Sequence, residues 1–514
     1  MSKTIIIIGA GLAGLSAALQ AAENGCNVKL VSSLPSERAQ SVMAEGGINA
    51  ALNTKDENDS PEEHFTDTIK AACGLADPNA VWGMTQAAPE LVHWLLKLGV
   101  KFNMCGYDDV DLRNFGGQKK KRTAFAQSDT GKQIMTAMID AVRRKEASGM
   151  VERFSHHSFL TLRLCGNICC GCVIRDEYSQ EIVELPGNAV IVASGGMHGL
   201  FGNTTGSLSN TGEVTAELFR LGVPLANGEM IQYHPTTVEC GGKRMLISEA
   251  ARGEGGRLFA LRNNQPWYFM EEKYPELGNL MPRDITAREI WKVSHESEVF
   301  LDMTEISKEI ISNKLSGLAD DCMTYLHKDI RKEPVPVLPG IHYFMGGILV
   351  DEQHRTSIQN LYAAGECCAQ YHGANRLGGN SLLGALYGGR VAAKSACEQA
   401  DGVVLSCAAQ IDIPPVQEIV GTKQLNQAMQ DSLGVVRNGN SLLKGIRKVQ
   451  ELKGTLPLLG LAVLQSAFAR KESRGAHWRE DYPECNNRDF LKTTVARFDG
   501  KQIQISFMSV PERR

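Results

Sequence analysis

A glycine-rich turn between a strand and a helix, at the start of the chain, most constrains how this sequence can fold. Thr4 to Ile8 is a β-branched run that predicts a buried parallel strand, and Gly9-Ala10-Gly11-Leu12-Ala13-Gly14 follows at once. The apolar spacing of Leu15 to Asn24 predicts a helix with Gly25 beyond its end, and Val28 to Val31 predicts a second strand. A GxGxxG turn in this context is typical of a Rossmann-type nucleotide-binding fold.

Each glycine of the turn has a separate physical reason. Gly9 makes the tight turn, Gly11 lets backbone N–H groups approach a pyrophosphate, and Gly14 lets the helix pack on the strand. The second strand is followed by Ser32 and Ser33 instead of the acid that holds an NAD ribose. The pattern therefore favours a flavin nucleotide over NAD.

Three later segments return to the same kind of sheet. Residues 44–51 form a second glycine-rich loop, residues 189–196 predict a strand ending in a glycine pair, and residues 360–366 predict a strand, a turn and an acid. FAD is long and needs contacts from several crossovers. We therefore expect an FAD domain built from distant pieces, with another domain inserted between them.

Length and charge narrow the class of protein further. A chain of 514 residues is too long for one core, so we expect two to four domains. The net charge of −4 argues against nucleic acid as a partner. The first residues lead directly into a strand without a secretory signal, and no apolar run is long enough to span a membrane. We expect a cytoplasmic protein, which partner subunits could hold on the cytoplasmic face of a membrane.

A set of sequence blocks then gives a specific resemblance. From about residue 4 to about residue 500, the chain resembles the succinate dehydrogenase/fumarate reductase flavoprotein family, which also includes L-aspartate oxidase. The stretches 53–65 and 266–290 look most like the menaquinone-linked branch. The matching blocks lie at residues 115–117, 122–123, 130–131, 232–236, 248–256, 282–284, 342–347, 365–367, 372–382 and 472–477.

The resemblance implies an α/β fold with three parts. We expect a Rossmann-like FAD-binding domain from residues 1–233 and 348–402, and an inserted α+β capping domain from residues 234–347. A C-terminal helical domain would occupy residues 403–475, followed by a tail from 476 to 514. Substrate would bind between the FAD and capping domains. Within the helical region, the apolar segment Leu456 to Ala469 predicts a buried helix.

The chemistry of a C4 dicarboxylate fits the polar residues of these blocks. A site that buries two negative charges needs cationic and hydrogen-bonding groups at both ends. The resemblance implies that His234 and Ser248 hold one carboxylate, and that His342 and Arg376 hold the other. Phe115 matches an aromatic residue that helps to twist the substrate.

The resemblance also implies how protons move. Arg283 matches the proton donor and acceptor, while Glu249 and Arg252 match its relay. Arginine is an unusual acid, since its reference pKa lies above about 12. A neighbouring cation and a carboxylate relay are what such a role requires. The implied reaction interconverts succinate and fumarate by hydride transfer at flavin N5, with Arg283 supplying or removing the proton.

The expected cofactor is FAD, held without a covalent bond. Most quinone-linked members of the family attach FAD to a histidine shortly before the glycine-rich loop, and here that position is Gln40. Without the bond, which raises the flavin potential in the family, fumarate reduction should be favoured. The block Thr211 to Val214 also departs from the family's TGDG. The predicted FAD contacts are Gly9, Gly11, Leu12, Ala13, Gly14, Ser32, Ser41, Gly46, Gly47, Ala193, Gly195, Glu213, Glu366, Arg376, Ser381 and Leu382.

We expect no metal in the chain itself. Cys165, Cys169, Cys170 and Cys172 are dense, but they fit a hairpin turning at Gly166-Asn167 and lack the paired spacings of iron–sulfur ligands. In the family, electrons pass to a separate iron–sulfur subunit, and through it to a membrane anchor and quinone. We expect the same kind of partner here.

Several alternatives remain open at the level of sequence. L-aspartate oxidase is the main alternative function, since it lacks partner subunits and covalent FAD; a reductase of another unsaturated acid, or an electron carrier without turnover, are others. Arg474 and His477 could brace the flavin or a subunit interface. The basic run from Lys119 to Arg122 is expected to be a solvated loop, or else a partner contact.

Overall fold

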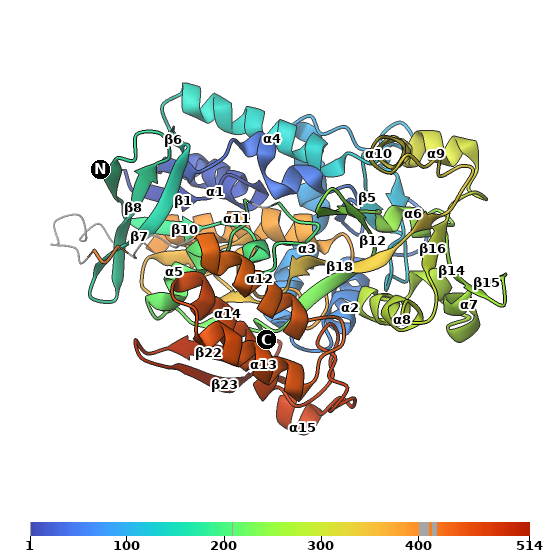
Figure 1. The fold of residues 1–514 in the computed structure, drawn as a ribbon. Coiled ribbons are helices and arrows are strands. Elements are labelled where there is room, and N and C mark those ends of the chain that lie inside the picture. The colour runs from blue at the N-terminus through green and yellow to red at the C-terminus, as the bar shows by residue number, and fades with distance from the viewer. Residues whose placement is uncertain (1, 208, 400–410, 414–418) are drawn as a thin grey trace.

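The nucleotide-binding sheet forms where the N-terminal pattern predicts it. The computed structural model describes residues 2–207, 209–399, 411–413 and 419–514 (Figure 1). Its central sheet has the strand order β20-β10-β1-β2-β6, and all four pairings are parallel. The five strands are β1 (Thr4–Ile8), β2 (Asn27–Ser32), β6 (Val151–Ser155), β10 (Ala189–Val192) and β20 (Leu361–Ala363).

This order confirms that distant segments build one sheet. β1 pairs with β2 on one side and with β10 on the other, and β20 extends the sheet beyond β10. Parallel strands need long crossovers, so hundreds of residues can lie between neighbours. The sheet packs against α1 (Leu12–Glu23), α3 (Pro78–Lys97), α4 (Thr130–Ala147) and α11 (Asn380–Gln399), which share its largest apolar core.

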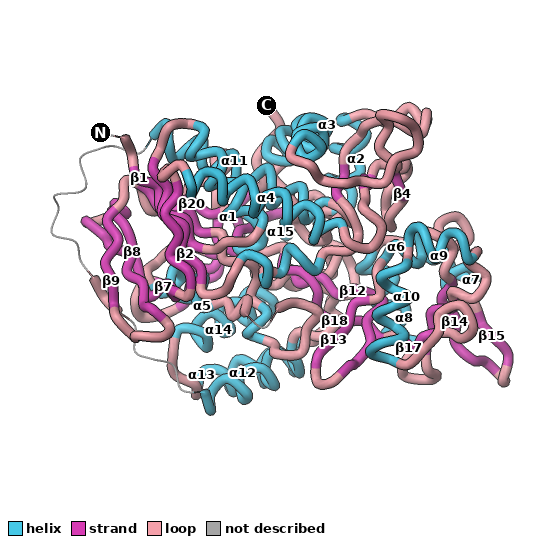
Figure 2. The backbone as a smooth tube through the Cα atoms, turned by 90° about the horizontal axis from the view of Figure 1, so that it is seen from above, coloured by secondary structure: helices cyan, strands magenta, loops and turns pink. Residues whose placement is uncertain are grey.

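Residues 234–347 form a mixed region at one side of the molecule (Figure 2). Its two sheets have the orders β13-β12-β18 and β15-β14-β16-β17, and five helices accompany them. The strands are β12 (Ile231–Cys240), β13 (Lys243–Leu246), β14 (Arg257–Arg262), β15 (Gln265–Trp267), β16 (Val299–Asp302), β17 (Val335–Pro336) and β18 (Leu338–Phe344). The helices are α6 (Glu249–Gly253), α7 (Phe269–Lys273), α8 (Arg283–Val293), α9 (Lys308–Lys314) and α10 (Ser316–Leu326). The α+β character matches the expected capping domain, although β12 runs through the predicted boundary at 233/234.

The C-terminal region combines helices with a further sheet. α12 (Ile419–Ser432), α13 (Gly439–Gln450) and α14 (Thr455–Ala469) share one apolar core, and α14 confirms the predicted buried helix. The predicted boundary at 402/403 lies outside the described residues. Beyond it, the predicted tail forms a hairpin of β22 (Lys492–Phe498) and β23 (Ile503–Ser509). This hairpin extends a sheet with β11 (Leu225–Ala226), β19 (Gly347–Leu349) and β21 (Cys368–Ala369).

The cysteine-rich segment is a hairpin, as predicted. β7 (His157–Cys165) pairs antiparallel with β8 (Ile168–Asp176), which in turn pairs with β9 (Ile182–Pro186). Cys169, Cys170 and Cys172 lie buried along β8 as free thiols. In the described part of the chain, no three His, Cys, Asp or Glu side chains are grouped to hold a metal ion.

Arg474 and His477 take part in a buried charge network of the C-terminal region. Arg474 Nε donates to Glu472 Oε1 at 2.8 Å, and His477 Nδ1 lies 2.9 Å from Arg437 Nη1. Arg470 joins the network through Glu472, at 2.7 Å. Arg474 therefore braces this region through its ion pair with Glu472, and His477 does so through its hydrogen bond with Arg437. Among the helices that the structure describes, none has the length and apolarity that a bilayer crossing requires.

The prediction for the basic run was wrong at its last residue. Arg122 is fully buried and pairs with Asp59 Oδ1 at 2.9 Å and with Asp67 Oδ2 at 3.0 Å. Both acids precede it by more than fifty positions, so a local charge count could not show the pairing. Lys121 remains exposed, as expected of a loop.

Replacing Arg122 with alanine should destabilise the protein strongly, because the buried carboxylates of Asp59 and Asp67 lose the guanidinium group that pairs with both. Breaking such a buried pair costs about 3–5 kcal/mol. Lys121→Ala is the matched control, since Lys121 makes only an exposed pair with Glu57 at 3.6 Å. Thermal unfolding of the two FAD-loaded variants measures the effect, and an equal midpoint for both would contradict it.

Candidate active site

A cavity of about 650 Å³ is lined by both the glycine-rich turn and the mixed region. Its walls come from the loop after β1, the loop before β3 (Ile48–Asn49), the loops after β10 and β20, and the β12–β13 hairpin. The carboxyl ends of parallel strands are where ligands bind in such sheets. The cavity therefore lies at the expected edge, and its volume suits a cofactor and a small substrate.

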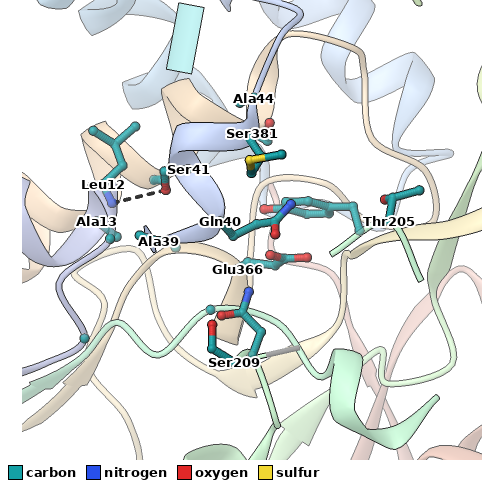
Figure 3. A pocket seen from close by; sticks show the side chains of 18 of the residues that line it. Leu12, Ala13, Ala39, Gln40, Ser41, Ala44, Thr205, Ser209, Glu366 and Ser381 are labelled. Atoms are coloured by element: carbon teal, nitrogen blue, oxygen red, sulfur yellow. Dashed lines mark hydrogen bonds between the residues drawn. The ribbon is translucent and has the colours of Figure 1, made fainter. Parts of the chain in front are cut away.

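The end of the cavity near α1 fits a nucleotide pyrophosphate. A Cβ atom on Gly9 would lie 2.2 Å from the Ala193 carbonyl oxygen, so only glycine allows this approach. The N-terminus of α1 faces the cavity, and Leu12 N donates to Ser41 Oγ at 3.2 Å (Figure 3). The buried Ser32 Oγ has no hydrogen-bond partner within the protein, as expected of a group that binds a ribose hydroxyl of the cofactor.

The structure brings nearly all predicted FAD residues together. Gly14 is the exception: it lies behind the cavity, where an added Cβ would be 1.8 Å from the Gly9 carbonyl oxygen. Its role is the close helix–strand packing assigned to it from the sequence. The others line the cavity: Gly9, Gly11, Leu12, Ala13, Ser32, Ser41, Gly46, Gly47, Ala193, Gly195, Glu213, Glu366, Arg376, Ser381 and Leu382.

Gln40 occupies a central place in the same cavity. It begins a 3₁₀ turn (Gln40–Met43), and its side chain points into the space between Ser41 and the pair Thr205 and Glu366 (Figure 3). Its Oε1 accepts from Ser207 N at 2.5 Å. The residue at the predicted attachment position is thus an amide within the cofactor space.

The predicted proton-transfer residues form a hydrogen-bonded chain. Arg283, the first residue of α8, donates from Nη2 to Glu249 Oε2 at 2.6 Å and from Nε at 2.9 Å. Glu249 begins α6, and its Oε1 accepts from Arg252 Nη2 at 3.1 Å. Arg283 Nη1 also donates to Gln232 Oε1 at 3.1 Å. Arg283 and Glu249 line the cavity, whereas Arg252 lies behind them.

The predicted substrate-binding residues surround this chain. His234 on β12 and His342 on β18 have ring centroids 5.1 Å apart, because the two strands are paired. Arg376 lies over the Tyr343 ring at 4.2 Å, and its buried Nε has no hydrogen-bond partner. His234 Nε2 is also buried and unpartnered. An anionic ligand in the cavity would satisfy Arg376 Nε and, when the His234 ring carries its proton on Nε2, that nitrogen as well.

Ser248 and Phe115 complete the pocket from two different elements. Ser248 is the N-cap of α6, and its Oγ accepts from Ala250 N at 3.4 Å. Phe115 is buried against the glycine-rich loop, since a Cβ on Gly46 would lie 2.9 Å from its ring. Ser248 and Phe115 thus lie where the cofactor loop meets the mixed region.

Burial and neighbouring charge set the ionisation of these groups. Burial, followed by the charge of Arg283, holds the pKa of both His234 and His342 well below its usual range, so both rings are neutral. Burial lowers the pKa of Arg376 to about 9, with Arg283 adding to the effect. Burial opposes ionisation of Glu249, but Arg283 and Arg252 outweigh it and lower its pKa. Three guanidinium groups around Glu249 leave an excess of positive charge for a dianion.

Sequence reasoning missed four residues of this site. Gln232 Oε1 accepts from Arg283 Nη1, and Thr205 Oγ1 lies 2.8 Å from His342 Nδ1. The Tyr343 ring packs against the Arg376 guanidinium, and Glu45 lines the cavity. Gln232, Tyr343 and Glu45 stand inside blocks that had already been singled out. Because these three residues adjoin predicted site residues in the sequence, that proximity could have identified them as site residues too.

Comparison with known proteins supports an FAD site in this cavity. Residues 4–382 match the family described as FAD binding domain, and residues 454–513 match that described as fumarate reductase flavoprotein C-term. The succinate dehydrogenase flavoprotein subunit of Bacillus subtilis (strain 168) is 39% identical, with 100% of this chain and 98% of the relative covered. The 8-methylmenaquinol:fumarate reductase flavoprotein subunit of Wolinella succinogenes is 31% identical, with 100% and 92% covered.

A solved structure of a variant of E. coli quinol fumarate reductase FrdA superposes with a TM-score of 0.90 at 28% identity, covering 99% of this chain and 97% of that one. The match therefore extends over the FAD-binding sheet, the mixed region and the C-terminal region together. The sequence matches, the fold match and the residues lining the cavity all indicate an FAD-dependent enzyme of the same family. The chain belongs to the succinate dehydrogenase/fumarate reductase flavoprotein family, and it is an FAD-dependent oxidoreductase.

Proposed function

We propose that this protein interconverts succinate and fumarate. The observation that carries the proposal is a single cavity in which the unpartnered His234 Nε2 and Arg376 Nε lie beside the Arg283–Glu249 pair, together with the glycine-rich loops expected to hold FAD. A C4 dicarboxylate is the small substrate whose two charges match this set. Relatives named as succinate dehydrogenase and as fumarate reductase flavoprotein subunits support it.

Residues from several different elements would hold the two ends of the substrate. His342 and Arg376 would bind one carboxylate, and His234 with Ser248 would bind the other. His234 Nδ1 lies 3.1 Å from the Thr236 carbonyl oxygen and 3.3 Å from Thr236 N; in the tautomer in which Nδ1 accepts from Thr236 N, the neutral ring presents Nε2–H to an anion. Because the site is buried and preorganised, each contact is stronger than it would be in water.

Proton movement would use the chain from Arg283 to Arg252. Reduction of fumarate adds one hydride to one alkene carbon and one proton to the other; bound FAD supplies the hydride chemistry. Arg283 gives the proton and recovers it from Glu249, which is resupplied through Arg252. Gln232 and Glu249 together fix three nitrogen atoms of Arg283, so the guanidinium points at one place in the cavity. Succinate oxidation is the reverse.

A dye-linked assay tests the proposal directly. The FAD-loaded protein should oxidise reduced methyl viologen when fumarate is added, and reduce an acceptor dye with succinate. L-aspartate with oxygen should give no turnover; activity with aspartate alone would favour the oxidase instead. Absence of fumarate- and succinate-dependent turnover in protein that carries FAD would overturn the proposal.

The cofactor is predicted to be released by acid. Gln40 stands at the family's attachment position, and an amide cannot form the flavin–imidazole bond. Precipitation with trichloroacetic acid should therefore leave all yellow colour in the supernatant. Yellow, fluorescent protein in the washed pellet would show a covalent link elsewhere.

We further propose an iron–sulfur subunit as electron partner, connected through a membrane anchor to quinone. The relatives named as subunits support a multi-subunit assembly. Purification of the tagged chain from its own cells should bring down a protein with iron–sulfur signals in electron paramagnetic resonance. A chain that purifies alone while remaining active with quinol would contradict this.

A further inference from the structure

The guanidinium group of Arg376 is buried without a carboxylate partner. Arg376 lines the cavity, and its Nε atom has no hydrogen-bond partner. Among the residues that the structure describes, none forms an ion pair with this group. Arg283, in the same pocket, pairs with Glu249 Oε2 at 2.6 Å. Because a buried cation without an acceptor is costly, the charge of Arg376 needs another kind of support.

The aromatic face of Tyr343 gives this support. Arg376 Cζ lies 4.2 Å from the centroid of the Tyr343 ring, and the ring is buried. A cation over an aromatic ring is attracted by the negative face of the ring, more strongly where water is excluded. This attraction uses none of the N–H donors of the guanidinium and adds no negative charge to the pocket. The charge and the donors of Arg376 therefore stay available for a substrate carboxylate, which a carboxylate partner would not allow.

The ring and the arginine are each fixed by further contacts. Tyr343 lies on β18 opposite Gln232 of β12. The His372 ring packs against Tyr343 in a T-shaped arrangement with centroids 5.3 Å apart. Burial holds the pKa of His372 well below its usual range, so this ring is neutral and adds no cation beside Arg376. Gln232 Nε2 donates to the Arg376 carbonyl at 2.9 Å, which fixes the backbone of the arginine next to the ring.

Resting on the proposed function, we infer that Tyr343 is a positioning residue for substrate: its ring holds the Arg376 guanidinium in place for a substrate carboxylate and leaves the N–H donors unpaired. The two arginines of the pocket then have different supports because they have different roles. Arg283 exchanges protons and is paired with a carboxylate, whereas Arg376 binds an anion and lies over a ring. The effect of Tyr343 belongs to its ring face and not to its hydroxyl group.

The test compares Tyr343→Phe with Tyr343→Leu, both loaded with FAD. Tyr343→Phe keeps the ring face, so KM for fumarate should stay within about twofold of wild type. Tyr343→Leu keeps an apolar side chain but removes the ring, so KM should rise by about 5- to 30-fold, the size of a desolvated cation–π contact. Because Arg283 and its relay are untouched, kcat should stay within about threefold. Tyr343→Met also lacks a ring but fits irregular spaces, so it gives the same test if Tyr343→Leu does not fold.

A double-mutant cycle separates this role from general packing. In an Arg376→Met background the ring has no cation to hold, so Tyr343→Leu should change kcat/KM by less than about twofold further. Tyr362→Leu is the matched control, since Tyr362 is buried on β20 and does not line the cavity. This variant should lower the midpoint of thermal unfolding and leave KM unchanged.

Calorimetric titration with malonate repeats the comparison without turnover, because this short dicarboxylate cannot be converted into an alkene. Its Kd should rise in Tyr343→Leu and not in Tyr343→Phe. An unchanged affinity in Tyr343→Leu, an equal rise in Tyr343→Phe, or the same effect of Tyr343→Leu with and without Arg376 overturns the inference. Absence of wild-type turnover with both fumarate and succinate would instead overturn the proposed function, while the malonate titration would still decide the role of Tyr343.

Discussion

Replacing Arg283 with glutamine is expected to lower kcat by about 10³–10⁴-fold in both directions, the upper range for a positioned general acid. The structure gives the reason: Arg283 is the group that faces the cavity and is also hydrogen-bonded to the Glu249–Arg252 relay. Glutamine fits the space but cannot deliver a proton. FAD content, measured by absorbance, should stay at the wild-type level, because Arg283 belongs to the substrate end.

Two variants make this prediction specific. Arg283→Lys keeps a positive charge but cannot span Glu249 and Gln232, so KM should stay within about tenfold of wild type while kcat remains low. Arg288→Gln is the matched control on the same helix, since Arg288 stacks on Trp478 at 4.0 Å and does not line the cavity. If Arg283→Gln keeps more than a tenth of the wild-type kcat, Arg283 is not the proton donor.

Replacing Arg376 with methionine should act on affinity more than on the chemical step. Arg376 is 3% exposed, and its guanidinium lies over Tyr343 with Nε unpartnered, so its charge is available to a substrate carboxylate. Loss of one partner of a buried charge pair costs about 2–5 kcal/mol. KM for fumarate should therefore rise by roughly 30-fold to several thousand-fold.

The control for Arg376 is a cation at the edge of the same cavity. Lys243 on β13 lines the cavity but is exposed, so Lys243→Gln should change KM by less than about threefold, and only at low salt. Initial rates over a range of fumarate concentrations at two ionic strengths separate the two cases. An Arg376→Met variant with wild-type KM would show that the other carboxylate contacts suffice.

The parts of the fold that depend on local rules could be predicted from the sequence. The β-branched run of β1 and the GxGxxG turn predicted the Rossmann sheet, because a buried parallel strand and a phosphate-binding turn each have a short-range signature. The hairpin of β7 and β8 followed from its turn residues, and α14 from its apolar length. The family blocks predicted the substrate-binding residues, but not the residues that hydrogen-bond to them.

Other features could not be predicted, because they depend on contacts between distant segments. The basic run from Lys119 to Arg122 predicted one solvated loop, yet Arg122 is buried between Asp59 and Asp67. The predicted C-terminal tail gives two strands that extend a sheet containing β11, more than 250 positions earlier. Both outcomes reflect pairing across the fold, which local composition does not encode.

The sequence by itself determined the class of fold, the cofactor and the types of residue in the proposed substrate site, since turns, strands and family blocks are all features of short stretches of sequence. Only the tertiary structure decided which two nitrogens of Arg283 bind Glu249, and that Gln232 binds the third. The physical reason is that ionisation and hydrogen-bond direction depend on burial and on neighbours within a few ångströms. Those neighbours come from separate parts of the chain, and only folding brings them together.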